Sequence, residues 1–481
     1  MTNYRSLKYH SMFRLSLFAP PLRKMPLTPY RLLAIVFLLT ILVSLFAVDR
    51  VMASRPDYID SERPAAFSNR DEEYPLEAFQ PQDAILRPSV FLELKEKTAS
   101  LSPFWRDTRM NLHIRSYYFA SDIADTANEE AWALGGWLEY ESGWWKDLLK
   151  VGGTGYTSQK LYGPEDRDGT LLLKPGQEGF SVLGQAYLRA RIAQGVDLRL
   201  YRQSLELPYI NKNDSRMVPN TFEAYTLDGE SIQKTDFIVS HVTKMKTRNA
   251  SEFRYMSAVA GFPDTDKGLT MGGAKYSFTD DIYIGAISQY SWDLWNTAYA
   301  EATGVWNLTE AVEIGLSAQY TDQRSVGDAL DGAFSTSVYG AQVALSYKGA
   351  IISFAFSATD DERRIQRPYG DTPSYVSLME AKFDRAGEDA WRMGLSYDFG
   401  FAGVDGLSAF ADYARGRTPD SGPAASPDQE EIDLTVDYRF KKGPLERLWL
   451  RFRSAFLNQQ GPNAQDIINF RIILNYDLPI L

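Results

Sequence analysis

The chain has no cysteine, and histidine is nearly absent. The lack of cysteine excludes disulfide bridges, thiolate metal sites and cysteine nucleophiles. Three histidines (His10, His113 and His241) leave little material for histidine-based catalysis or for a multi-histidine metal centre. Basic residues are not in excess either, because 51 Lys/Arg stand against 62 Asp/Glu and give a net charge of −11. A nucleic-acid-binding protein would show a basic stripe. We therefore expect no cofactor, no metal and no nucleic-acid partner.

Long apolar runs are also lacking, with one exception near the start of the chain. Residues 32–48 are apolar at all but two positions and follow a basic stretch. This is the order of regions in a secretory signal peptide, and Ala53 ends a suitable cleavage site. We predict a signal peptide over residues 1–53, with translation starting at Met1 or Met25. The alternative is a single membrane anchor, because the run reaches the short end of a spanning helix.

Residues 54–109 differ in composition from the rest of the chain. They are rich in Pro, Asp, Glu and Arg and show no alternation of apolar and polar positions. We predict an acidic, Pro-rich N-terminal extension, mobile in its first half, with one short helical turn near residues 91–96. The leader holds seven Lys/Arg and one Asp, so its removal changes the 51 basic and 62 acidic residues to 44 and 61, a net charge of −17.

From residue 110 onward the chain alternates between apolar and polar positions. The last segment shows this most clearly, with only Ile473 interrupting the series Phe470, Ile472, Leu474, Tyr476 and Leu478. A period of two gives a strand one apolar and one polar face. About eighteen such segments of roughly ten residues, with short and long connections in turn, are typical of a transmembrane barrel. We predict an all-β fold over residues 110–481: an antiparallel transmembrane β-barrel closed by pairing of its first and last strands.

Three stretches resemble a known family. They are Asn111–Phe119 (NLHIRSYYF), Asn213–Phe222 (NDSRMVPNTF) and Asn469–Pro479 (NFRIILNYDLP), and the chain resembles the OprD family of Gram-negative outer-membrane porins in them. The resemblance implies an eighteen-stranded barrel with a narrow lumen, which passes small solutes that typically carry a carboxylate. It also implies that the third extracellular loop folds inward and faces a ladder of arginines. The chain departs from the family pattern at Asp412, where a basic residue is expected, and its extension over residues 54–90 is longer than usual.

The same resemblance implies the cellular setting and the partners. The protein is expected in the outer membrane after export, with outer-membrane lipid, the outer-membrane assembly machinery and small solutes as partners. Its last strand is similar to the terminal assembly signal of outer-membrane proteins, although it ends in Leu481 instead of an aromatic residue. The chain is expected to be a monomer or a loose homotrimer.

Arginines collect on the inward-facing positions of strands near the barrel seam. The predicted pore-lining track consists of Arg115, Arg189, Arg191, Arg199, Arg439, Arg451, Arg453 and Arg471. Several guanidinium groups in a narrow lumen would attract carboxylates, and each offers a fork suited to a bidentate contact. The alternative is that these arginines pair with wall acids such as Asp197, Glu431, Asp433 and Asp437 and only brace the barrel.

The loop over residues 205–221 is the predicted constriction. Its short polar residues favour tight turns that can hold a loop in one shape. The candidate lining residues are Tyr209, Asn213, Asp214, Ser215 and Arg216, and we expect Asp214 and Arg216 to pair with each other. The alternative is an ordinary surface loop. For the second long loop, residues 360–389, we favour a solvated external position over inward folding.

These features favour a passive diffusion channel, with pore diameter and lining groups setting its selectivity. The alternative function is a barrel hydrolase of the outer membrane, of protease or lipase type. Such an enzyme would need His113 or His241 beside a serine and an acid. We expect no catalytic residues and no enzyme activity.

Overall fold

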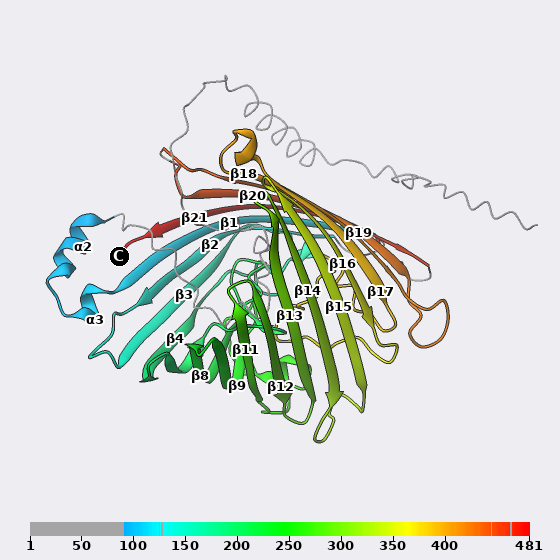
Figure 1. Ribbon diagram of the computed structural model, residues 1–481, viewed down its shortest axis with the longest axis horizontal. Helices are drawn as coiled ribbons and strands as arrows, with labels where there is room; N and C mark the ends of the chain where they lie inside the picture. Colours follow the sequence, from blue (N-terminus) through cyan, green and yellow to red (C-terminus); the bar gives the residue numbers. More distant parts are fainter. Residues whose placement is uncertain (1–90, 125, 127, 444, 462–463) are drawn as a thin grey trace, which may run out of the picture. The chain divides into compact units, whose positions relative to one another are not determined.

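The computed structural model describes residues 91–481, except for residues 125, 127, 444 and 462–463 (Figure 1). The predicted signal peptide and residues 54–90 of the predicted extension lie outside the described residues. The described part begins with two short helices, α2 (Leu92–Ala99) and α3 (Pro103–Arg106), near the predicted helical turn. No helix in this part of the chain is long and apolar enough to cross a membrane.

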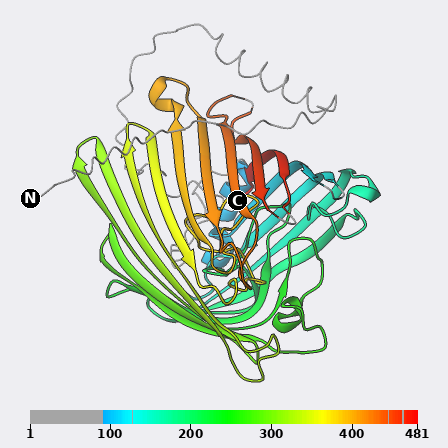
Figure 2. The same cartoon turned by 90° about the vertical axis from the view of Figure 1, so that its right-hand side faces the viewer.

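Eighteen long strands form one antiparallel barrel. Each strand pairs with the next along the chain, and β1 pairs with β21 from Asn111↔Pro479 to Ile123↔Ile467, so the predicted closure is confirmed. Figure 1 shows β1 and β21 side by side, and Figure 2 shows the red C-terminal strand next to the blue and cyan N-terminal ones. The strands are β1 (Arg109–Ile123), β2 (Glu129–Glu141), β3 (Leu149–Tyr162), β4 (Phe180–Ala193), β5 (Val196–Gln203), β8 (Thr221–Ile232), β9 (Thr235–Lys246), β11 (Leu269–Thr279), β12 (Ile282–Ser291), β13 (Trp295–Thr309), β14 (Val312–Ser325), β15 (Ser335–Tyr347), β16 (Ala350–Thr359), β17 (Asp389–Asp398), β18 (Leu407–Arg417), β19 (Asp428–Arg439), β20 (Leu448–Gln460) and β21 (Ile467–Pro479).

The connections differ between the two ends of the barrel. One end carries short turns such as 194–195, 233–234 and 348–349. The other end carries the long connections, which contain the small elements η2 (Glu165–Arg167), β6 (Glu206–Leu207), β7 (Ile210–Asn211), β10 (Arg254–Tyr255) and α4 (Met256–Val259). In outer-membrane barrels the short turns face the periplasm and the long loops face outward. We therefore assign the end with the long loops to the extracellular side.

Burial along each strand follows the alternation in the sequence. On β19 the apolar Ile432 and Leu434 are 45% and 41% exposed, whereas Glu431 and Asp433 are 0% and 5% exposed. The apolar side chains therefore face the lipid, and the polar ones point into the barrel. Ile473, which interrupts the alternation in the last strand, is buried inside the barrel in a cluster with Tyr117, Phe119 and Phe180.

Aromatic pairs mark the membrane boundary at the short-turn end. Three pairs of residues two apart meet edge to face: Tyr276 with Phe278, Tyr397 with Phe399, and Tyr438 with Phe440, with ring centroids 5.0, 4.9 and 4.8 Å apart. Aromatic girdles of this kind flank the apolar band of transmembrane barrels.

The main apolar core lies inside the barrel. Leu205, Leu207, Tyr209 and Ile210 enter from the loop between β5 and β8 and pack against inward-facing residues of the wall, among them Phe222. These side chains fill one part of the lumen, and a cavity lies against the wall formed by β15 to β21.

The outward face of β19 provides a test of the barrel. Replacing Leu434 with Arg places a charge near the middle of the apolar band, and we expect it to lower the free energy of unfolding by about 2–4 kcal/mol. The same replacement at Leu445, in the turn between β19 and β20, should cost about 1 kcal/mol or less. Urea titration of protein folded into lipid vesicles measures both values. Equal losses at the two positions would contradict the assignment of the outer face.

Candidate pore constriction

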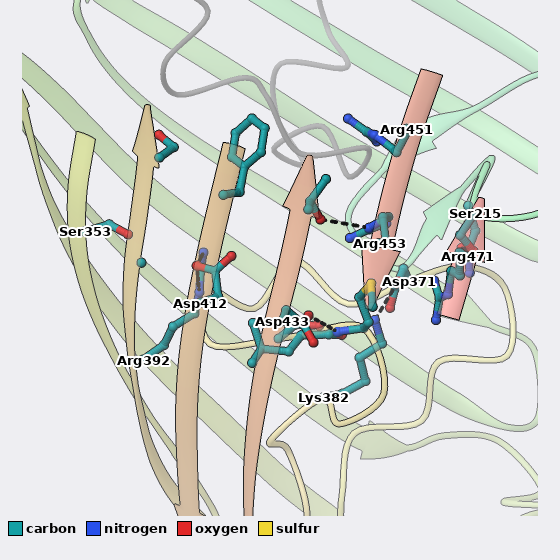
Figure 3. Close-up of a pocket in the computed structure, with 18 of the residues that line it drawn as sticks. Ser215, Ser353, Asp371, Lys382, Arg392, Asp412, Asp433, Arg451, Arg453 and Arg471 are labelled. Atoms are coloured by element: carbon teal, nitrogen blue, oxygen red, sulfur yellow. Dashed lines mark hydrogen bonds and ion pairs between the residues drawn. The ribbon is translucent and has the colours of Figure 1, made fainter. Parts of the chain in front are cut away.

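A cavity of about 380 Å³ lies inside the barrel (Figure 3). It is lined by β15 to β21 and by three segments that enter from the extracellular end: residues 204–220, 247–268 and 360–388. Figure 3 shows Arg451, Arg453 and Arg471 to one side of the cavity and Arg392 with Asp412 to the other. The cationic lining residues are Arg216, Arg248, Arg367, Lys382, Arg392, Arg451, Arg453 and Arg471, and the acidic ones are Asp371, Asp412 and Asp433.

The segment 360–388 folds into the barrel, so the expectation of a solvated external loop was wrong. Its residues Tyr375, Val376 and Phe383 are at most 1% exposed. They pack with wall residues such as Ala390 and Ala414 in one apolar cluster. The charged start of the segment, which suggested an external loop, is followed by apolar residues that need burial.

Two wall carboxylates hold the inserted segment by its backbone. The Met379 N–H donates to Asp433 Oδ2 at 2.9 Å, and the Glu380 N–H donates to Glu431 Oε1 at 2.9 Å. The Ala381 N–H donates to Glu431 Oε2 at 2.7 Å. Buried N–H groups need partners, and each of these three finds one in a carboxyl oxygen of the wall. These three consecutive bonds fix residues 379–381 against β19.

Elsewhere in the lumen, side-chain amides hold the backbone of the inserted 360–388 segment in a similar way, by bonding to both the N–H and the carbonyl of one residue. Asn211, in the 204–220 segment, donates through Nδ2 to the Asp371 carbonyl at 3.1 Å and accepts the Asp371 N–H on Oδ1 at 2.9 Å. On the wall, Gln323 makes the same two bonds to the backbone of Gln366, at 2.9 and 2.7 Å. A Cβ atom at Gly370 would lie 2.7 Å from the Asn211 nitrogen, so the two inserted segments are in close contact.

Three arginines of the predicted track line the cavity, and each has partners on the wall or on a loop. Arg451 donates from Nε and Nη2 to the two carboxylate oxygens of Asp437, at 2.7 and 2.6 Å. Arg453 donates to Thr435 Oγ1 at 3.3 Å. Arg471 donates to the Asn469 side chain and, at 2.7 Å, to Glu380 Oε1. The wall therefore orients guanidinium groups that also face the open space.

The other five predicted track residues do not belong to the lining of this cavity: Arg115, Arg189, Arg191, Arg199 and Arg439. Arg189 donates to Asp197 at 2.7 Å, and Arg191 lies over the Trp144 ring at 4.0 Å. These contacts lie near the short-turn end of the barrel and fit the wall-bracing alternative.

In the predicted constriction loop, Asn213, Ser215 and Arg216 line the cavity. Tyr209 is buried and does not line it, because its hydroxyl contacts Thr321 Oγ1 at 2.8 Å on the wall, and burial raises its pKa to about 12.

The expected pair of Asp214 with Arg216 is not formed, and the two residues have other partners. Asp214 accepts from Arg115 at 2.7 Å. Arg216 donates from Nε to the Thr170 carbonyl at 2.7 Å. Burial, together with the nearby guanidinium of Arg471, lowers the pKa of Arg216 to about 9, so it keeps its charge at neutral pH.

Four cations of the lining were missed in the sequence: Arg248, Arg367, Lys382 and Arg392. Arg392 has inward parity on β17, and this signal could have found it. Its Nε donates to Asp412 at 2.9 Å, so the acid that departs from the family pattern stands beside an arginine. The other three come from loops, where no periodicity indicates direction.

His113 and His241, the two histidines in the described part of the chain, contact partners other than serine. His113 contacts Asp477 through Nδ1 at 2.7 Å and Asn475 through Nε2 at 3.0 Å. His241 lies on an exposed position of β9 and contacts Thr270 Oγ1 at 2.9 Å. Among the described residues, neither ring is hydrogen-bonded to a serine, and no group of three or more acids or histidines could hold a metal ion.

Comparisons with known proteins agree with this architecture. A family model described as "outer membrane porin, OprD family" matches residues 102–480. Porin D of Pseudomonas aeruginosa is 23% identical over 426 residues, which cover 80% of this chain and 93% of Porin D. The crystal structure of OccK9 (OpdG) from P. aeruginosa superposes with a TM-score of 0.72 at 25% identity, over 79% of this chain and all of that one. OpdK from the same organism gives a TM-score of 0.70 at 20% identity, over 78% of this chain and all of that one.

The two hydrogen bonds between the Asn211 side chain and the Asp371 backbone provide a test of how the inserted segment is held. Asn211→Ala leaves the backbone N–H and carbonyl of Asp371 without these partners, which should cost about 1–3 kcal/mol. We expect a larger and noisier conductance in planar bilayers and faster protease cleavage within residues 360–388. Asn307→Ala, at an exposed position on β13, is the matched control and should behave like the unmodified protein. Unchanged conductance and cleavage in Asn211→Ala would show that these two bonds do not hold the segment.

Proposed function

Because the chain belongs to the OprD family of outer-membrane porins, we propose that it forms a narrow, water-filled channel for small solutes that carry a carboxylate. Such solutes are amino acids and organic or aromatic acids. The selectivity region consists of the inserted segments 204–220 and 360–388 and of the arginines that face them across the cavity. The partners in this proposal are outer-membrane lipid and the assembly machinery, and the chain acts as a monomer or a loose homotrimer.

The charge of the cavity lining carries this proposal. Eight cationic side chains and three acidic ones line the same space of about 380 Å³. A cleft with walls of low dielectric constant and a surplus of one charge concentrates ions of the opposite sign. The lining therefore favours anions, although the whole chain carries a net charge of −11.

The type of cation favours carboxylates among the possible anions. Seven of the eight lining cations are arginines, and a guanidinium presents a planar fork of donors that matches a carboxylate. One structural neighbour, OpdK, was solved with vanillate, which is an aromatic carboxylate. Ile351, Leu378 and Phe410 lie in the same lining and give apolar contact for the body of such a solute.

We expect the purified protein to conduct ions in planar bilayers and to prefer anions to cations. The surplus of lining cations is the physical reason. The reversal potential under a potassium chloride gradient measures this preference. Liposome swelling with a panel of amino acids, aromatic acids and sugars would then identify the solute class. A complete absence of single-channel conductance would contradict the proposal.

The two arginines of β20 should set this anion preference. Replacing Arg451 and Arg453 together with Ala removes two charges from the lining, and we expect the chloride preference to fall by roughly threefold, since lining charge governs ion selectivity. The control is the double variant with Arg106 and Arg324 replaced by Ala, which removes two charges from side chains that are 47% and 59% exposed. Equal reversal potentials for the two double variants would refute a role for this part of the track.

A further inference from the structure

One arginine of the cavity is already occupied by a carboxylate from an inserted segment. Arg471 Nη2 donates to Glu380 Oε1 at 2.7 Å. The Arg471 side chain is 3% exposed and that of Glu380 is 18% exposed. Arg471 comes from the wall strand β21, whereas Glu380 comes from the 360–388 segment, more than ninety positions earlier in the chain. The same carboxylate also interacts electrostatically with Arg216, a second cation of the lining.

The backbone around Glu380 is held, and its side chain is therefore presented from a rigid base. The N–H groups of Met379, Glu380 and Ala381 all donate to wall carboxylates, at distances of 2.7 to 2.9 Å. The Glu380 carboxylate has no part in these bonds. Its removal would leave the three backbone bonds in place, so the contact with Arg471 can be changed without losing the fold of the segment.

The pair differs from the other ion pairs of the cavity. Arg451 and Asp437 face each other on neighbouring strands, where Asp437 pairs with Arg451 in the sheet register, and both side chains are at most 6% exposed. That pair is part of the wall. Glu380 instead belongs to an inserted loop and binds a wall arginine, as a carboxylate-bearing solute would.

We propose that Glu380 is a tethered competitor of solute carboxylates: it occupies Arg471 in the empty pore and sets how strongly a solute must bind to take its place. This inference rests on the proposed function of the channel. A solute carboxylate reaches Arg471 only by displacing Glu380 or by sharing the guanidinium with it. Solutes with a single weak anionic contact are then held less tightly, and passage through the site is faster.

Glu380→Gln tests the proposal in the full-length protein. The amide keeps the size of the side chain and can still accept a bond from Arg471, but its charge is gone. With benzoate as the probe, we expect the half-saturating concentration for block of the chloride current to fall about tenfold, since a charged partner no longer competes for Arg471. We also expect the chloride preference in the reversal potential to rise. Benzamide, which has the shape of benzoate but no charge, should show no such change.

Two further variants separate the contact from the net charge. Glu362→Gln removes the same charge from an exposed position of the same segment and should leave benzoate block unchanged. Glu380→Asp keeps the charge but shortens the side chain by one methylene group. We expect its half-saturating benzoate concentration to lie between those of the unmodified protein and Glu380→Gln. In a protein that already carries Arg471→Gln, the replacement of Glu380 should have little further effect.

The outcomes distinguish this inference from the proposed function. If the unmodified protein forms no anion-preferring channel, the proposed function fails. If it prefers anions and is blocked by benzoate, but Glu380→Gln and Glu362→Gln give the same block as the unmodified protein, the tethered competitor alone is refuted. If the half-saturating benzoate concentration falls by a similar factor in both glutamine variants, the effect comes from the net charge of the segment, and the inference is also overturned.

Discussion

The pairing of buried backbone groups inside the lumen is the constraint on which the constriction depends. A strand in the wall satisfies its N–H and C=O groups with its neighbours, but a segment that enters the barrel has no such ladder. Here the wall supplies side chains for that purpose. Glu431 and Asp433 accept three consecutive N–H groups, and Gln323 pairs with both backbone groups of Gln366. The inserted segments can therefore hold one position close to the charged wall.

The barrel wall carries two kinds of arginine, and their position relative to the cavity separates them. Arg189, near the short-turn end, pairs with Asp197 and braces the barrel. Arg451 and Arg471 also have acidic partners, yet they line the open space. An ion pair thus does not remove an arginine from the lining. It orients the guanidinium, because one edge of the fork is held and the group cannot swing freely.

The alternation of residue types was sufficient to predict the barrel. On β21 the positions from Asn469 to Leu478 alternate between polar and apolar except at Ile473, and in the structure they face inward and outward as expected. Ile473 packs inside the barrel with Tyr117. The face to which a strand side chain points follows from its odd or even position, since successive side chains point to opposite faces. This is why Arg451, Arg453 and Arg471 could be placed in the lumen from the sequence, and why Arg392 could have been.

Loops do not obey that rule, and two predictions about loops were wrong. The charged start of the 360–388 segment suggested solvent, but its later residues, such as Val376 and Phe383, are buried in the barrel. Asp214 was expected to pair with its neighbour Arg216, whereas its partner is Arg115 on β1. In both cases the wall residues that contact the loop are far away in the sequence, and they come close to it only after the barrel has closed.

The sequence by itself determined the class of fold, the closure of the barrel and the inward face of several strands, because these depend on a period of two and on the burial of apolar surface. Only the tertiary structure decided which charges share the cavity. Arg248, Arg367 and Lys382 reach it from loops, and Glu380 meets Arg471 across ninety residues of chain. The physical reason is that electrostatic interaction depends on distance in space, and a loop's path through the lumen is set by the wall groups that satisfy its backbone.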